Sequence, residues 1–229
     1  MLLRRLRIVV FAPHPDDELI GAGSILKWKD EGHDVHIIYI TDGRAAYSYE
    51  RARGRLDESK GNINITDEEL AEIRMKEIDE VTEFLGIPKE NIYKFKIPDQ
   101  EAKNHIKKGI ELSKPIIKDA DRIVLPSNNN PHVDHQATYD IAVGAAKELD
   151  LKNTEFYGYC IYVAQKVPKE KLVKINIREY RDKIFEALSK YKSQLVISLV
   201  RAFYNTIKKK PAEFFGKYSF SDIGKYYNF

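Results

Sequence analysis

One histidine and three carboxylates, His14-Pro15-Asp16-Asp17-Glu18, follow directly after a short apolar run at residues 8–11. The apolar run predicts a buried strand. A buried strand that ends in titratable side chains is how an open α/β sheet presents chemistry at its carboxyl edge. A second group, Pro131-His132-Val133-Asp134-His135, comes soon after another apolar run, at residues 123–125. We therefore expect these two groups to form the two halves of one metal site.

The rest of the pattern predicts strands and helices in alternation. A strand at residues 7–11, a helix at 17–31 and a strand at 35–40 form a βαβ unit, whose right-handed crossover makes the two strands parallel neighbours. Further elements are expected as a helix from the capping box at 66–69 to Gly86, strands at 92–97, 123–125 and 156–163, and helices at 101–118, 137–149 and 176–192. We expect an α/β, Rossmann-like fold with a mostly parallel sheet and helices on both faces. A single domain over residues 1–229 is expected, because no linker, composition break or repeat divides the chain.

Two stretches lack a clear pattern. Residues 41–65 are interpreted as a long polar loop that leaves from the same sheet edge as His14, and loops of this length are usually functional or mobile. Residues 193–229 show one apolar stretch, at 195–200, and an aromatic-rich end. Within the helix at 101–118, Pro115 predicts a bend or a break.

Composition narrows the classes of partner. The net charge of +3 comes from 38 basic and 35 acidic residues, so no polyanionic partner is required. The basic clusters at 51–55 and 208–210 are interpreted as a solvated loop and a solvated helix end, and no nucleic acid is expected. No apolar run is long enough to span a bilayer, so a soluble protein without a membrane partner is expected. The aromatic end of the chain is compatible with a homo-oligomer.

A single cysteine, Cys160, restricts the metal chemistry. It excludes an intrachain disulfide and a cysteine-based zinc site, and it favours a reducing cytoplasm. Histidines and carboxylates remain as metal ligands.

His14 and Asp17 are spaced so that both side chains can converge on one ion across the turn from strand to helix. Asp16 would then lie beside the ion without binding it. Either His132 or His135 could be the third ligand, because both follow a strand that is expected to be parallel to the first. Two nitrogens and one carboxylate oxygen, with a fourth position open to water, make up a catalytic zinc site rather than a structural one.

The expected chemistry is hydrolysis of an amide or an ester. Zinc lowers the pKa of bound water to roughly 7 and polarises a carbonyl oxygen. Asp16 can accept the proton of that water and pass it to a leaving amine. The histidine that does not bind the metal can donate a hydrogen bond to the oxyanion, which is worth about 3 kcal/mol when it is well placed.

These two motifs resemble those of the PIG-L/LmbE-like family of zinc-dependent de-N-acetylases, which carry a His-Pro-Asp-Asp-Glu run and a His-x-Asp-His run. The resemblance implies a zinc hydrolase that removes acetyl from a small-molecule N-acetylglucosamine-type sugar, with another divalent metal as an alternative. It implies that the metal ligands are His14, Asp17 and His135. It further implies that Asp16 is the general base, that His132 stabilises the oxyanion or acts as an acid, and that Asp134 orients His132.

Weaker motifs extend the resemblance over most of the chain. Arg74 and Glu77 match an Arg-x-x-Glu pair whose arginine reaches the substrate, and Asp99 matches an acid that grips sugar hydroxyls. The closing motifs are matched by Ser193-Gln194 and by residues 212–215. The chain departs from many relatives after the second strand, where Thr41-Asp42-Gly43-Arg44 replaces a Gly-Glu pair and puts a cation near the site.

Two alternatives have a weaker basis. Gly21-x-Gly23 is a faint signal for a Rossmann-like nucleotide-binding protein without hydrolase activity. These glycines lie inside the first expected helix, however, and phosphate binds at the strand-to-helix turn. An inactive scaffold that binds a metal finds no support, because all the expected catalytic positions are filled.

Overall fold

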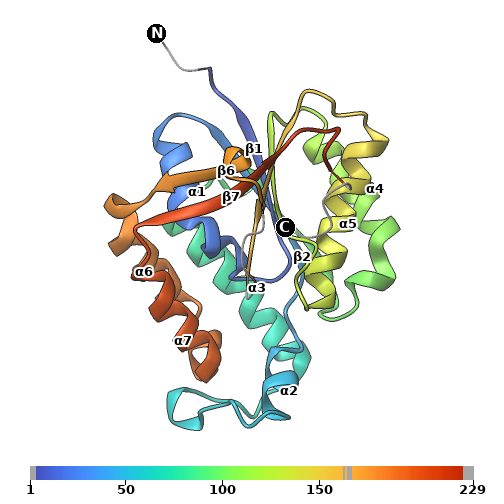
Figure 1. Ribbon diagram of the computed structural model, residues 1–229. Helices are drawn as coiled ribbons and strands as arrows, with labels where there is room; N and C mark the ends of the chain where they lie inside the picture. The colour runs from blue at the N-terminus through green and yellow to red at the C-terminus, as the bar shows by residue number, and fades with distance from the viewer. Residues whose placement is uncertain (1–3, 162, 164–166, 224–229) are drawn as a thin grey trace.

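The computed structural model describes residues 4–161, 163 and 167–223, and its centre is one seven-stranded sheet (Figure 1). The sheet has the strand order β3-β2-β1-β4-β5-β7-β6. Neighbouring strands from β3 to β5 are parallel, whereas β7 pairs antiparallel with both β5 and β6. The strands are β1 (Arg7–Ala12), β2 (Asp34–Thr41), β3 (Ile92–Ile97), β4 (Arg122–Pro126), β5 (Glu155–Tyr159), β6 (Leu172–Asn176) and β7 (Ala212–Tyr218).

Helices cover both faces of this sheet, so the predicted α/β class with a mostly parallel sheet is confirmed (Figure 1). Side chains of α4 and α5 contribute to the core on one face, and side chains of α1, α3 and α6 contribute to the core on the other. The helices are α1 (Ala22–Asp30), α2 (Ala46–Arg51), α3 (Asp67–Phe84), α4 (Ile106–Ile117), α5 (Val133–Glu148), α6 (Arg181–Lys190) and α7 (Ser198–Ile207). None of the helices in the described part of the chain has both the length and the apolar character needed to cross a membrane.

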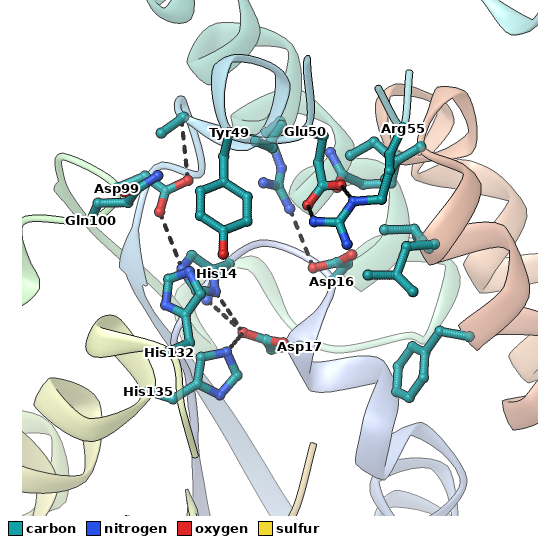
Figure 2. A pocket seen from close by; sticks show the side chains of 18 of the residues that line it. His14, Asp16, Asp17, Tyr49, Glu50, Arg55, Asp99, Gln100, His132 and His135 are labelled. Atoms are coloured by element: carbon teal, nitrogen blue, oxygen red, sulfur yellow. Dashed lines mark hydrogen bonds and ion pairs between the residues drawn. The ribbon is translucent and has the colours of Figure 1, made fainter. Parts of the chain in front are cut away.

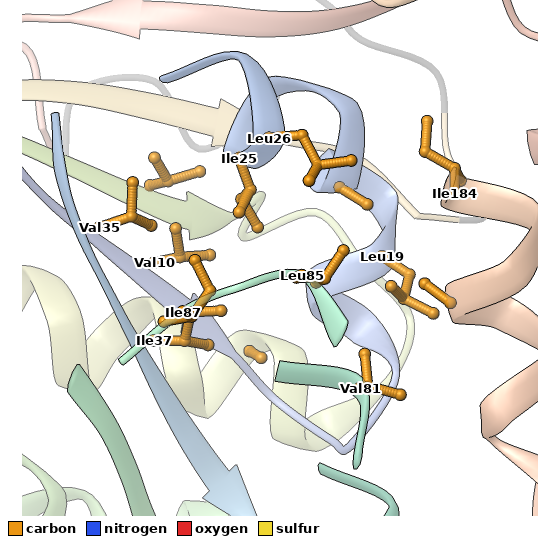
Figure 3. Packing of buried hydrophobic residues seen from close by; sticks show 14 of the residues in the cluster. Val10, Leu19, Ile25, Leu26, Val35, Ile37, Val81, Leu85, Ile87 and Ile184 are labelled. Atoms are coloured by element: carbon orange, nitrogen blue, oxygen red, sulfur yellow. The ribbon is translucent and has the colours of Figure 1, made fainter. Parts of the chain in front are cut away.

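Strand β1 shows why its sequence is apolar at every position. Ile8 and Val10 belong to the core beneath α1, α3 and α6, whereas Val9 and Phe11 belong to the core beneath α4 and α5. Figure 3 shows the first of these cores, in which Val10 packs near Ile25 of α1. A parallel strand that is buried on both faces needs apolar side chains at consecutive positions rather than at alternate ones.

The order of the strands explains where a site can form. From β1 the chain builds outward through β2 and β3, and then returns to build β4 and β5 on the other side of β1. β1 and β4 are therefore neighbours at the point where the strand order reverses, which is where open α/β sheets bind their ligands. Both histidine motifs leave the sheet at this point, one after β1 and one after β4.

Several elements differ from the sequence prediction. The expected helix at 17–31 begins as a 3₁₀ turn, Asp17–Gly21, and the loop at 41–65 contains α2 and a further short 3₁₀ turn. The expected strand at 156–163 ends at Tyr159 as β5, and residue 162 lies outside the described residues. The expected break before Pro115 is absent, because Pro115 stands in the last turn of α4 and removes only one hydrogen bond there.

The largest difference lies in the last third of the chain. The helix predicted at 176–192 is present as the shorter α6, but the sequence pattern did not predict β6 before it or α7 and β7 after it. β6 is an edge strand whose side chains are alternately exposed and half-buried, so lysine and asparagine interrupt its apolar pattern.

Candidate active site

The turn after β1 holds Asp16 in a strained backbone conformation. Its φ is 98°, a left-handed value that is uncommon for a residue with a side chain. The backbone N–H of Asp16 donates to Glu18 Oε2 at 3.0 Å, and Tyr191 donates its hydroxyl to Glu18 Oε1 at 2.7 Å. The side chain of Glu18 therefore stabilises the conformation in which Asp16 is presented, and strain of this kind clusters at functional sites.

Three side chains converge as metal ligands would. Asp17 Oδ2 lies 3.0 Å from His14 Nδ1 and 3.3 Å from His135 Nε2 (Figure 2). Ligands bonded to Zn²⁺ at 2.0–2.1 Å in a tetrahedron are separated by about 3.3 Å. The three atoms thus already have the spacing of a coordination shell. These residues also form one of two groups in the described chain that could hold a metal ion, the other being His14, Asp99, His132 and Asp134.

The second nitrogen of His14 faces two carboxylates. His14 Nε2 lies 3.1 Å from Asp134 Oδ2 and 3.2 Å from Asp99 Oδ1. Burial alone would lower the pKa of His14, but Asp99, Asp134 and Asp17 raise it well above its usual value. A carboxylate that accepts a hydrogen bond from the distal nitrogen of a ligating histidine fixes the ring and raises its basicity. Nδ1 of His14 is thus the nitrogen that faces Asp17 and His135, away from these two carboxylates.

His135 and Asp17, the other two candidate ligands, are in the protonation states that bind a metal cation. Burial lowers the pKa of His135 to about 3, so its imidazole is neutral near pH 7. Burial alone would raise the pKa of Asp17, but His135 and His14 beside it lower that pKa to about 2. A neutral imidazole and an ionised carboxylate are the forms that bind metal ions.

Asp16 lies in the same cavity, beside this group. Burial raises the pKa of Asp16 to about 7, although the nearby Arg74 acts to lower it. Arg74 Nη2 lies 3.2 Å from Asp16 Oδ1, and Tyr204 donates its hydroxyl to Asp16 Oδ2 at 3.2 Å. A general base works best when its pKa is close to the working pH.

Arg74 supports the turn rather than pointing freely at a ligand. Its guanidinium also donates to the backbone oxygens of Pro15 and Gly43. A Cβ atom at Gly43 would lie 2.3 Å from Arg74 Nη1, and the φ of Gly43 is +67°, so both space and backbone conformation require glycine there. Arg74 does line the cavity, and the predicted contact with substrate stays a prediction.

His132 is the N-cap residue of α5, and its ring accepts a hydrogen bond at Nδ1 from the backbone N–H of Asp134 at 3.2 Å. Burial lowers the pKa of His132, so the ring is neutral with its proton on Nε2. The ring is therefore set to donate a hydrogen bond. It is the backbone of Asp134 that orients His132, because the Asp134 carboxylate lies 4.0 Å from His132 Nδ1 and is hydrogen-bonded elsewhere.

Asp99 follows the end of β3, and each of its two carboxylate oxygens faces a different neighbour. One carboxylate oxygen faces His14, and the other accepts the backbone N–H of Ala45 at 3.2 Å. Figure 2 shows both contacts as dashed lines. Asp99 lines the cavity, its Oδ1 lies beside His14 without hydrogen-bond geometry, and the predicted grip on sugar hydroxyls stays a prediction.

A match to a family of known proteins agrees with this geometry. The model of the PIG-L family, described as GlcNAc-PI de-N-acetylase, matches residues 9–146, which include both histidine motifs and more than half of the chain. The chain belongs to the PIG-L family.

A curated protein matches part of the sequence, and solved structures share the fold. Mycothiol S-conjugate amidase of Streptomyces coelicolor is 36% identical over 87 residues, which are 38% of this chain but only 27% of that protein. N,N'-diacetylchitobiose deacetylase from Pyrococcus horikoshii superposes with a TM-score of 0.71 at 23% identity, covering 94% of this chain and 85% of that one. The zinc-inhibited form of teicoplanin deacetylase Orf2 gives a TM-score of 0.68 at 16% identity, covering 92% and 97%.

The nucleotide-binding alternative does not agree with the structure. The backbone N–H groups of Gly23 and Ser24, at the start of α1, donate to the buried carboxylate of Glu213 at 2.9 and 2.8 Å. A phosphate would have to displace this carboxylate. A Cβ atom at Gly23 would lie 2.5 Å from the side chain of Ile177, so this glycine permits close packing instead of a close approach to phosphate.

The weaker motifs hold the cavity together. Glu77 accepts hydrogen bonds from the backbone N–H and the hydroxyl of Ser193 at 2.7 and 2.6 Å, and Tyr47 donates to the Ser193 carbonyl at 2.9 Å. Gln194 follows and lines the cavity. The Arg-x-x-Glu pair thus binds the turn after β1 through Arg74 and the turn before α7 through Glu77.

Sequence analysis did not find the residues that complete the cavity. The cavity has a volume of about 300 Å³. Part of its lining comes from α2 and the residues after it, and part from α7 and the turn before it. These lining residues are Tyr49, Glu50, Arg55, Ile197, Leu199, Val200, Phe203 and Tyr204. The loop at 41–65, expected at the same sheet edge as His14, was a signal for the first group, whereas the apolar stretch at 195–200 carried no indication that it would face the histidines.

Proposed function

We propose that this chain is a metal-dependent hydrolase that removes the N-acetyl group from an N-acetylglucosamine-type sugar. Membership of the PIG-L family supports the reaction. The observation that carries the proposal is the arrangement of Asp17 Oδ2 between His14 Nδ1 and His135 Nε2, with Asp16 in the same cavity. A small molecule with an acetamido group is the proposed partner.

The proposed metal ligands are His14, Asp17 and His135, and the proposed ion is Zn²⁺. Two imidazole nitrogens and one carboxylate oxygen suit a catalytic zinc site, and other first-row divalent ions bind the same donors. When bound, such an ion supplies a water of lowered pKa and polarises the carbonyl group of the substrate.

Asp16 is the proposed general base. Its carboxylate is held from two sides by Arg74 and Tyr204, and its pKa near 7 allows it to accept a proton and release it again at neutral pH. It takes a proton from the attacking water and returns one to the sugar nitrogen, so the C–N bond breaks to give acetate and a free amine. His132 is proposed to donate its Nε2 proton in a hydrogen bond to the oxyanion formed from the acetyl oxygen.

Substitution of the base tests this assignment. Asp16→Asn keeps the size of the side chain and one oxygen that can accept from Arg74, and its amide nitrogen can donate to the Tyr204 hydroxyl, but it removes the ability to accept a proton. We expect acetate release from N-acetylglucosamine derivatives to fall by about 10²–10⁴-fold. Bound metal, measured by mass spectrometry of the purified protein, should stay at the level of the native chain.

Two results would contradict the proposal. Full activity of the Asp16→Asn variant would show that another group moves the proton. A native chain that releases acetate at the same rate before and after exhaustive chelation would show that no metal takes part. The identity of the ion is tested by restoring the chelated protein with Zn²⁺, Co²⁺, Mn²⁺ or Ni²⁺ in turn and comparing the rates.

A further inference from the structure

The cavity has two ends of different chemistry. We call one the histidine end, which is lined by His14, Asp17, His132 and His135. We call the other the apolar end, which is lined by Ile20, Ile197, Leu199, Val200 and Phe203. Asp16 and Tyr204 also line the cavity, and the hydrogen bond between them joins the turn after β1 to α7.

The apolar end keeps hydrophobic surface open to water. Leu199 is 41% exposed, although the same helix buries Tyr204 and Ile207 almost fully. Exposed apolar surface forgoes about 25 cal/mol per Å² of stabilisation. A single exposed leucine is ordinary, but several apolar side chains that line a concave site beside a few polar groups are typical of a ligand pocket.

The charged side chains of Glu50 and Arg55, which also line the cavity, are paired with each other. Arg55 Nη2 donates to Glu50 Oε1 at 3.0 Å, and Arg55 Nε contacts Glu50 Oε2 (Figure 2). The two charges satisfy each other. A second sugar ring that took its hydrogen bonds from these two residues would disrupt the pair, whereas an alkyl or aryl group would not.

The apolar end is held in place by the segment after α2. Leu56 forms an isolated antiparallel bridge with Ile197, and the backbone N–H of Ser198 donates to the Arg55 carbonyl at 3.0 Å. Arg201 on α7 donates to Asp57 Oδ2 at 2.9 Å. A preformed wall binds a ligand without first being ordered, which reduces the cost of binding.

We propose that the apolar end binds a hydrophobic substituent of the substrate, so that this chain prefers N-acylated sugars that carry an alkyl or aryl group. The inference rests on the proposed function, which places the amide of the substrate at the histidine end. The rest of the substrate then reaches the apolar end. The hydrophobic group could be the aglycone or a longer N-acyl chain. The two share the same chemistry, and substrates can separate them.

The test compares four substrates with the metal-loaded full chain, each below its aggregation concentration. These are methyl N-acetylglucosaminide, octyl N-acetylglucosaminide, methyl N-octanoylglucosaminide and N,N'-diacetylchitobiose, and free amine is measured. Each methylene buried at the apolar end should raise kcat/KM by about threefold to fourfold. We therefore expect at least a tenfold advantage for one octyl-bearing substrate over the methyl N-acetylglucosaminide.

A matched pair of variants locates the effect. Leu199→Ser should reduce the advantage of the octyl-bearing substrate to less than threefold. Leu172→Ser is the control, because Leu172 is 39% exposed, close to the 41% of Leu199, but lies on the edge strand β6 and not in the cavity. It should keep the full advantage. Thermal unfolding of both variants confirms that each is folded.

The outcomes separate this inference from the proposed function. A kcat/KM for both octyl-bearing substrates no higher than for methyl N-acetylglucosaminide, or the highest value for diacetylchitobiose, would overturn the inference and leave the hydrolase intact. If no substrate releases amine, the proposed function fails, and calorimetry then tests the apolar end by itself. Tighter binding of one octyl-bearing compound than of the methyl N-acetylglucosaminide, lost in Leu199→Ser, would support the inference, and equal binding of all three would overturn it.

Discussion

The histidine end and the apolar end of the cavity are built in different ways. Every candidate ligand at the histidine end lies within a few residues of the end of β1 or at the start of α5, which follows β4. The apolar end comes mainly from α7, which is positioned by the segment after α2. Reacting groups need positions fixed to fractions of an ångström, and neighbouring strands provide that precision, whereas a wall that excludes water needs only the correct shape and polarity.

The largest effect is expected from a substitution that removes metal binding at the histidine end and leaves the apolar end intact. His135→Ala removes one of the three proposed ligands, so we expect the purified protein to lose its metal and deacetylase activity to fall below detection. The apolar end should be unaffected, because His135 makes no contact there, and octyl glycoside should still bind. Metal analysis and calorimetry measure the two properties on one sample.

His105→Ala is the matched control for that substitution, because His105 lies in the turn before α4 and does not line the cavity. It should keep both metal and activity. Retention of the metal by His135→Ala would show that the second group in this region, with Asp99 and Asp134, holds the ion instead.

An intermediate effect on kcat is expected for Glu18, which supports the turn that carries Asp16. Glu18→Ala leaves the Asp16 N–H and the Tyr191 hydroxyl without their acceptor, and one unsatisfied buried group costs about 1–3 kcal/mol. We expect kcat to fall about tenfold, with KM and bound metal little changed, because the strained turn that presents Asp16 relaxes.

Glu18→Gln distinguishes positioning from charge. Burial raises the pKa of Glu18 to about 8, so its carboxyl group is mostly protonated at pH 7 and an amide of the same shape replaces it closely. The glutamine variant should keep most of the kcat that the alanine variant loses. Equal losses in both variants would mean that the turn does not depend on this hydrogen bond.

The smallest effect concerns Glu213, which lies outside the cavity and anchors β7 to α1. Burial raises the pKa of Glu213 to about 7 in the folded protein, above its ordinary value of 4.5. Between these two pH values the folded state holds a proton that the unfolded state has released. Stability should therefore fall as pH rises through this range, by at most about 1.4 kcal/mol per pH unit.

Glu213→Gln should lack this contribution. The difference in unfolding free energy between the native chain and the variant, measured by urea denaturation from pH 4.5 to 8, should change across that range and level off above it. A difference that does not vary with pH would mean that Glu213 stays ionised in the folded protein. Activity should be the same in both proteins, since Glu213 does not line the cavity.

Prediction from sequence succeeded where the pattern is local. β3 was predicted at its observed bounds, and the capping box of α3 forms through reciprocal hydrogen bonds between Thr66 and Glu69. It failed where tertiary contacts decide. Residues 46–51 form α2 although their sequence has little helical pattern, and Tyr47 anchors them by packing with Leu70, Val196 and Ile197 in a small core.

The sequence could not show which carboxylates face the Nε2 atom of His14. The resemblance to the PIG-L/LmbE-like family implied that Asp134 orients His132, whereas in the structure the Asp134 carboxylate lies 3.1 Å from Nε2 of His14. The α5 backbone carries the Asp134 side chain inward, where it also accepts the backbone N–H groups of Gln100 and Ala102. Asp99 likewise faces His14, a contact that only the packing of β3 beside β2 could produce.

The sequence by itself determined the reacting groups and their strands, because residues that follow a buried parallel strand must emerge at one edge of the sheet. It therefore determined that His14 to Glu18 and His132 to His135 belong to one site. Only the tertiary structure decided which nitrogen of each histidine faces which carboxylate, and which distant side chains form the apolar end. Most of those contacts join residues far apart in the sequence, as Asp16 and Tyr204 do, and depend on packing that no local pattern specifies.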